Sequence, residues 1–155
     1  NTEVCAMITD GEEAGLRGCK QWAKDHYDEY VNSGVETAVL CVDTLADLEY
    51  LRVYNKDMTG TVKNSQQFSQ LVMDSAKDSG HNDLQFSSVY FGSSDAAAFS
   101  QAGITATCLA AMDPKPADYY HNRRDTAERL VPEAIKTGFD VIISTILNFD
   151  EKGLN

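Results

Sequence analysis

Short apolar runs and longer amphipathic stretches alternate along the chain, a pattern that predicts strands and helices in turn. The apolar runs lie at residues 4–9, 38–42, 51–54, 87–91 and 104–110. The run at 38–42 is continuous, as in a strand that is covered on both faces. The run at 51–54 follows it too closely for a crossover helix, so we expect these two strands to be antiparallel neighbours in a mixed sheet.

Apolar residues at steps of three and four predict helices between these runs. The first helix is expected over 16–30, with an inward side that includes Cys19, Trp22 and His26. A second is expected to begin after Asn64 or Ser65 and to end near residue 80. A short helix over 96–101 is expected to be capped by Asp95. The last begins at residue 132 and should bury one apolar side, formed by Ile135, Phe139, Ile142, Ile143 and Ile146.

This alternation predicts an α/β fold in which helices cover both faces of a mixed, mostly parallel sheet. The length of 155 residues suits a single domain over residues 1–155. In such sheets ligands bind beyond the carboxyl ends of the strands. Polar residues that follow strands are therefore the first candidates for a functional site.

Composition excludes several classes of partner. The chain has 13 basic and 24 acidic residues, and its formal net charge of −11 disfavours nucleic acid and anionic membrane surfaces. No apolar run approaches the roughly 20 residues that cross a bilayer. The four cysteines, at positions 5, 19, 41 and 108, lack the spacing of a zinc knot or a disulfide framework. Cys5, Cys41 and Cys108 are expected to be buried in strands as small apolar residues.

Four carboxylates, Glu12, Glu13, Asp43 and Asp95, and one histidine, His121, follow expected strands. Glu12 and Glu13 are neighbours at a strand-to-helix junction, where one can hold a cation while the other faces water. They can also simply complement a helix dipole in a first helical turn. Asp43 ends an apolar run, so it is either paired, bound to metal or a solvated loop residue. His121 lies among tyrosines and arginines, where a ligand role and a surface role are both open.

Four segments, in this order, resemble the zinc aminopeptidases of peptidase family M28. The sequence TDGEEAGLRG at residues 9–18 looks like the paired-glutamate motif of that family, and CVD at 41–43 looks like its strand-end aspartate. GSSDAAAF at 92–99, followed by GI at 103–104, looks like its late turn. YYH at 119–121, followed by DT at 125–126, looks like its terminal histidine block.

The resemblance implies a role for each of five residues. Glu12 matches the general base, and Glu13 and His121 match two ligands of one zinc ion. Asp43 matches a ligand of a second zinc ion, and Tyr120 matches a donor to the oxyanion. The implied activity is di-zinc hydrolysis of N-terminal residues from peptides.

The chain also departs from the family pattern. The family uses a further histidine and a metal-bridging aspartate upstream of the paired glutamates, and neither is among the eleven residues that precede Glu12. We therefore expect the carboxyl-terminal part of a longer catalytic domain, which alone binds zinc weakly or not at all and has no appreciable peptidase activity. A truncated sheet would expose a strand edge and invite homodimer formation.

Two other functions are compatible with these residues. One is a peptidase-like domain that has lost its chemistry and serves as a binding module. The other is glutaminyl cyclase chemistry, which the resemblance associates with one zinc ion. Because relatives are often exported or membrane-anchored, the resemblance favours an extracytoplasmic or membrane-anchored location.

Overall fold

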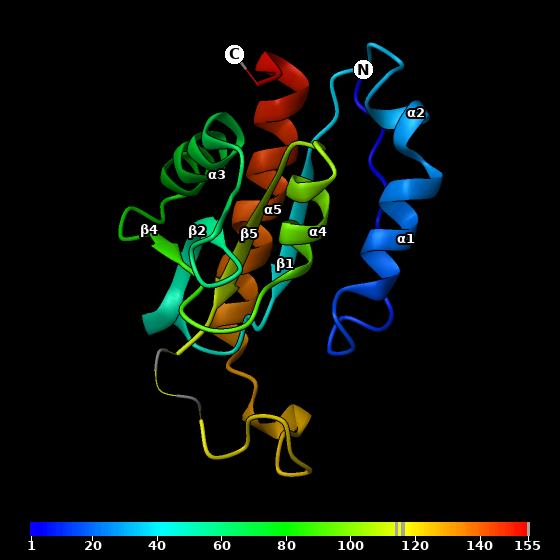
Figure 1. Cartoon of the computed structure of the whole chain (residues 1–155). Coiled ribbons are helices and arrows are strands. Elements are labelled where there is room, and N and C mark those ends of the chain that lie inside the picture. The colour runs from blue at the N-terminus through cyan, green and yellow to red at the C-terminus, as the bar shows by residue number, and fades with distance from the viewer. Residues whose placement is uncertain (114, 116, 155) are drawn as a thin grey trace.

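A mixed sheet forms the centre of the computed structural model, which describes residues 1–113, 115 and 117–154 (Figure 1). Its strands within that range are β1 (Val39–Asp43), β2 (Leu51–Asp57), β3 (Val62–Lys63), β4 (Gln85–Ser88) and β5 (Ala106–Ala111). The order is β1-β5-β2-β3, and β4 also pairs with β2. Pairs β1–β5 and β2–β4 are parallel, whereas β2–β5 and β2–β3 are antiparallel. The predicted mixed α/β sheet is confirmed, but the expectation that it is mostly parallel is not, because two of the four described pairings are parallel and two are antiparallel.

Helices cover both faces of this sheet, as predicted. The helices are α1 (Arg17–Asp25), α2 (Tyr27–Tyr30), α3 (Gln66–Asp78), α4 (Asp95–Gln101) and α5 (Pro132–Lys152), with short 3₁₀ helices at Leu48–Tyr50 and Ala127–Arg129. On one face α4 lies against the sheet and α1 packs beside it, while α3 and α5 pack together on the other face (Figure 1). Even the longest helix in the described part of the chain, α5, lacks the apolar length that crossing a membrane requires.

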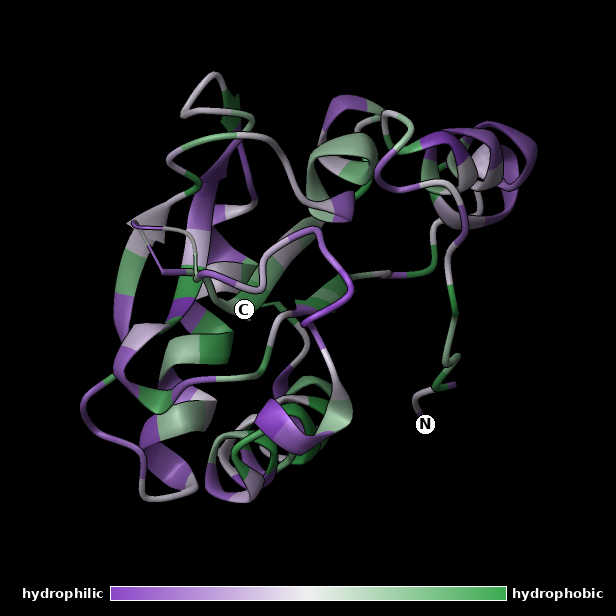
Figure 2. Cartoon of the chain, turned by 90° about the horizontal axis from the view of Figure 1, so that it is seen from below, coloured by the Kyte–Doolittle hydropathy of each residue, from purple (hydrophilic) through white to green (hydrophobic). Residues whose placement is uncertain are grey.

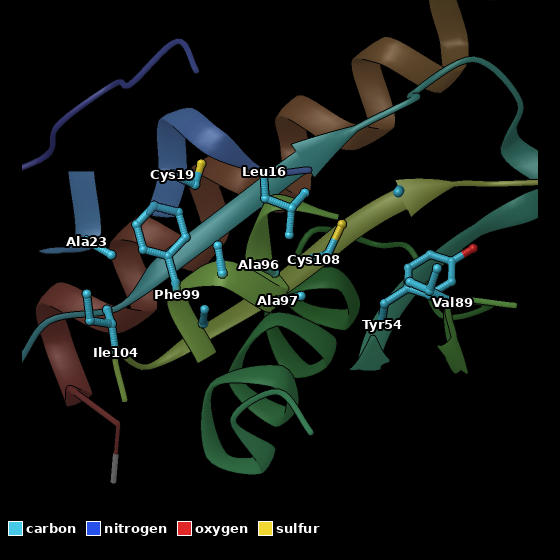
Figure 3. Close-up of a cluster of buried hydrophobic side chains, with 13 residues drawn as sticks. Leu16, Cys19, Ala23, Tyr54, Val89, Ala96, Ala97, Phe99, Ile104 and Cys108 are labelled. Atoms are coloured by element: carbon cyan, nitrogen blue, oxygen red, sulfur yellow. The ribbon is translucent and has the colours of Figure 1, made fainter. Parts of the chain in front are cut away.

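The two faces of β5 contribute to two separate hydrophobic clusters. Cys108 and Ala110 face α1 and α4, where Ala96, Ala97 and Phe99 complete the first cluster (Figure 3). The alternate residue Leu109 belongs to the second cluster, under α3 and α5. In Figure 2 the strands alternate between hydrophobic and hydrophilic colour, and the outer turns of α1 are mostly hydrophilic. Because all residues of β5 are buried, this strand fixes where both helical layers pack.

The N-terminal segment is not the strand that its apolar pattern predicts. Residues 4–9 form no strand, and the side chains of Val4 and Ile8 are 59% and 99% exposed. Cys5 is exposed as well, contrary to the expectation that it is buried. An apolar run becomes a strand only when a neighbouring strand satisfies its backbone, and no described strand pairs with this one.

Strand pairing corrects two further expectations. The strands β1 and β2 are not neighbours, because β5 lies between them and pairs with both. The predicted strand at 87–91 is instead β4, Gln85–Ser88, and is followed by a loop that returns the chain to α4. Sequence pattern alone does not reveal which strand is inserted between two others, since that depends on tertiary packing.

The packing side of α5 also differs from the prediction. The helix buries mainly small residues: Ala134, Thr137, Gly138, Val141 and Thr145. Of the apolar residues assigned to the inner side, Phe139 and Ile143 are more than half exposed. Gly138 explains why this side of α5 is buried: the helix lies so close to Leu45 that a side chain at position 138 would collide with the Leu45 side chain. Close approach of the helix therefore determines the buried side, rather than residue hydrophobicity.

A buried carboxylate fastens the loop before α4 to the sheet. Asp57, at the end of β2, is fully buried and accepts hydrogen bonds from the Ser94 backbone N–H at 2.9 Å and the Ser94 hydroxyl at 2.6 Å. It also accepts one from the Met58 N–H at 2.7 Å. Ser94, rather than the predicted Asp95, caps α4 by accepting from the Ala96 N–H.

Replacing Asp57 by alanine should lower the free energy of unfolding by about 2–4 kcal/mol, because buried donors on Ser94 and Met58 lose a charged acceptor. Urea denaturation followed by circular dichroism measures the change. The matched control is Asp74→Ala on the exposed side of α3, where an ion pair with Lys77 contributes less than about 1 kcal/mol. Equal losses in the two variants would contradict this role of Asp57.

Candidate functional site

The paired glutamates lie on a tight loop that precedes α1. The backbone N–H groups of Gly15 and Leu16 both donate to the Glu12 carbonyl, at 2.9 and 2.8 Å, and the Gly18 N–H donates to the Asp10 carbonyl at 2.9 Å. A side chain at position 18 would collide with that Asp10 oxygen, so the close crossing requires glycine. Because α1 begins at Arg17, with no acidic residue in its first turn, the paired glutamates do not serve as first-turn helix-dipole partners.

Glu13 is in direct contact with His121, although the two residues are far apart in the sequence. The Glu13 Oε1 atom and the His121 Nε2 atom are 3.0 Å apart, and both side chains are more than half exposed. His121 has a left-handed backbone conformation with a φ of 56°. Residues other than glycine rarely adopt this conformation, so the loop around His121 must hold it there. The sequence alone left a ligand role and a surface role open for His121.

An aromatic residue packs against the His121 ring. The Tyr120 ring stacks on the His121 ring with centroids 3.9 Å apart and planes inclined by 14°. Phe91, from the loop before α4, meets the Tyr120 ring edge to face at 6.2 Å. Burial and the negative charges of Glu13, Asp43 and Glu12 raise the pKa of Tyr120, so its phenol stays protonated at neutral pH. A protonated phenol is a hydrogen-bond donor.

Glu12 differs from Glu13 in its surroundings. It is partly buried, and burial together with the charges of Glu13, Asp43 and Asp95 raises its pKa to about 7, while His121 acts in the opposite direction. A carboxyl group with a pKa in this range exchanges protons readily at neutral pH, which suits a general acid or base. Glu12 is therefore the candidate for proton transfer at this site.

Asp43 ends β1 at the same edge of the sheet as the carboxyl end of β5, where its register partner is Ala110. Its Oδ1 atom accepts a hydrogen bond from the Thr44 hydroxyl at 2.8 Å. Its charge acts on Glu12 and Tyr120, but it does not join Glu13 and His121 in direct contact. Across the described ranges, no three histidine, cysteine or acidic side chains are grouped closely enough to hold a metal ion.

Asp95 also belongs to the surroundings of Glu12, although the sequence suggested only a helix cap. It is 8% exposed, and its Oδ2 atom accepts a hydrogen bond from the Thr9 hydroxyl at 2.7 Å. Its other oxygen is buried and has no hydrogen-bond partner within the described structure. The sequence did contain a signal for this role of Asp95. Serine is an equally good N-cap, so Ser94 can cap α4 and leave the Asp95 side chain free for another contact.

The residues present suit zinc in chemical type. Carboxylate and imidazole are common zinc ligands, and the accumulation of three further acidic groups around Glu12 favours a bound cation. In the described arrangement, however, only Glu13 and His121 approach each other at the distance of a shared ligand site. The described residues therefore fit a zinc site only in part. Suitable donor side chains gather at one edge of the sheet, but only Glu13 and His121 are in contact.

Known structures share the fold of this chain. LapB from Legionella pneumophila is 18% identical, with a TM-score of 0.71 over 93% of this chain and 38% of that chain. A glutaminyl cyclase from an Acidobacteriales bacterium is also 18% identical, with a TM-score of 0.69 over 89% of this chain and 47% of that chain. BSAP, a zinc aminopeptidase from Bacillus subtilis, is 21% identical, with a TM-score of 0.66 over 90% of this chain and 33% of that chain.

These similarities establish the fold, and in each of the three cases the chain spans less than half the length of the known structure. Comparison with curated protein sequences gives no significant match. The model of peptidase family M28 matches residues 1–146, which include every segment of the site described above. The chain therefore belongs to peptidase family M28.

Proposed function

We propose that the protein containing this chain is a zinc-dependent aminopeptidase that removes N-terminal residues from peptides. The observation that carries the proposal is the 3.0 Å contact between Glu13 and His121, two potential zinc ligands that the fold brings together. Membership of a peptidase family supports hydrolysis as the reaction class. Similarity to a zinc aminopeptidase supports the metal.

Glu13 and His121 would hold one zinc ion, and Asp43 would contribute to a second. When bound, zinc polarises the scissile carbonyl and lowers the pKa of water toward neutrality. Catalytic zinc sites generally use three protein ligands, and the described residues supply fewer to each ion. We therefore propose that further ligands are needed for activity and that this chain alone is inactive.

Glu12 and Tyr120 would handle the protons and the charge of the reaction. Glu12 accepts a proton from the attacking water as the oxygen adds to the carbonyl carbon, and it returns a proton to the leaving amine when the C–N bond breaks. The Tyr120 hydroxyl donates a hydrogen bond to the carbonyl oxygen as negative charge develops there. Its raised pKa keeps that hydroxyl protonated while it acts.

A second candidate is cyclisation of an N-terminal glutamine, which the similarity to a glutaminyl cyclase favours. The same general base would then remove a proton from the attacking amine of the substrate. An aminoacyl chromogenic substrate and a glutaminyl peptide, assayed in parallel on the complete protein, separate the two reactions. A binding module without chemistry would act on neither substrate.

Changing Glu12 to glutamine in the complete protein should lower kcat by about 10²–10⁴-fold while leaving the zinc content unchanged, because the variant loses the general base but no metal ligand. Steady-state kinetics and metal analysis of the same preparation measure both quantities. Glu13→Gln should lower both activity and zinc content.

Glu29→Gln on α2 is the matched control, because Glu29 is exposed and bonds only to His26 among the described residues. It should leave kcat and zinc content at their original values. Full activity in Glu12→Gln would contradict the proposed base, and retention of zinc in Glu13→Gln would contradict the proposed ligand.

The chain of 155 residues should bind zinc weakly or not at all in isothermal titration calorimetry. The physical reason is that Glu13 and His121 supply only two contacting donors, and each is more than half exposed. His121→Ala should abolish any heat that the unmodified chain gives. Tight binding of two zinc ions per chain would refute the proposed need for further ligands.

A further inference from the structure

Two cysteines face each other directly across neighbouring strands of the sheet. Cys41 on β1 and Cys108 on β5 are register partners in a parallel pair. Neighbouring strands lie about 4.8 Å apart. Cα atoms joined by a disulfide are usually roughly 4.4–6.8 Å apart. The strand spacing therefore falls inside the range that a disulfide needs.

Both thiols lie on the same face of the sheet. Register partners in a parallel pair point to the same side: Cys108 belongs to the hydrophobic cluster beneath α1 and α4, and the partly buried Cys41 packs against that cluster. The neighbouring Cys41 thiol, together with burial, raises the pKa of the Cys108 thiol. The sulfur atoms are therefore neighbours, and no strand shift is needed to bring them together.

The two positions differ in access to solvent. Cys108 is fully buried, with β5 paired on both sides, whereas Cys41 is partly exposed on a strand whose described pairing is with β5 alone. A reagent from solution can therefore reach Cys41 but not Cys108. Such a pair has the arrangement of an attacking thiol and a resolving thiol.

We propose that Cys41 and Cys108 form a thiol–disulfide exchange site that reacts with small disulfides of the glutathione class and closes a bond between β1 and β5. The site is separate from the proposed peptidase chemistry. Its bond would join the strand that ends in Asp43 to the buried centre of the sheet.

The exchange proceeds in two balanced steps. The Cys41 sulfur attacks one sulfur of oxidised glutathione, which breaks the glutathione S–S bond, and the released glutathione thiol takes up the Cys41 proton. The Cys108 sulfur then attacks the Cys41 sulfur of the mixed disulfide, and the second glutathione leaves as a thiol that takes up the Cys108 proton. The two cysteines lose two electrons and two protons in total, and these appear in the two glutathione thiols.

The remaining cysteines do not compete for this bond. Cys19 is buried on α1, and burial first, and then the Asp95 carboxylate, raise the pKa of the Cys19 thiol. Cys5 is exposed on the N-terminal segment and is not a member of the cluster. A Cys5→Ser background removes linkage between chains through that residue without touching the buried cluster.

The test treats the folded Cys5→Ser chain with oxidised glutathione, alkylates the remaining thiols after denaturation and maps linked peptides by mass spectrometry. Free thiols should fall from three to one, and the linked peptides should contain Cys41 and Cys108. Adding Cys41→Ser should leave Cys19 and Cys108 both free. Adding Cys19→Ala instead should leave the Cys41–Cys108 linkage intact.

A reversible stability shift provides a second measurement that needs no cluster variant. Oxidation should raise the urea midpoint of the Cys5→Ser chain, because a bond between the two strands restricts the unfolded chain, and dithiothreitol should restore the original midpoint. A linkage of Cys41 to Cys19, a glutathione adduct that persists on Cys41, or three thiols that remain free would each overturn the proposal.

Discussion

The structure depends on the requirement that β5 satisfy its backbone on both sides while it is completely buried. It meets this requirement by pairing with β1 in parallel and with β2 in antiparallel orientation. The position of Asp43 at the sheet edge follows from the first pairing. The second pairing positions β2, which carries Asp57 beyond the residues that pair with β5, and Asp57 fastens the loop before α4. Side chains from distant parts of the sequence are therefore placed by one strand.

Electrostatics places a second constraint on the same edge. Glu12, Glu13, Asp43 and Asp95 bring negative charge into one region, and burial prevents water from screening Glu12 fully. Within the described structure, the opposing influence on Glu12 comes from His121, which reaches the region through its contact with Glu13. Such an arrangement is costly unless protons or cations bind there, as is common at functional sites. The acidic side chains that suit this edge for catalysis therefore also lower the stability of the fold when no proton or cation is bound there.

Local signals predicted much of the fold, because they act over a few residues. Ser65 does cap α3, and its hydroxyl accepts from the Phe68 N–H as an N-cap should. Strand neighbours depend on distant residues, so the insertion of β5 and the unpaired state of residues 4–9 were not predicted. At the site, motifs identified Glu13 and His121, but their contact required tertiary structure. The register that aligns Cys41 with Cys108 is likewise invisible in the sequence.

The outward side of α5 has a consequence for behaviour in solution. Phe139, Ile143 and Leu147 are each more than half exposed and follow one another at four-residue steps, so they form an apolar ridge along the helix. The net charge of −11 makes copies of the chain repel each other. Salt screens such repulsion beyond about 10 Å at 0.1 M, but it does not weaken hydrophobic attraction. Colloidal stability of this chain therefore falls as ionic strength rises.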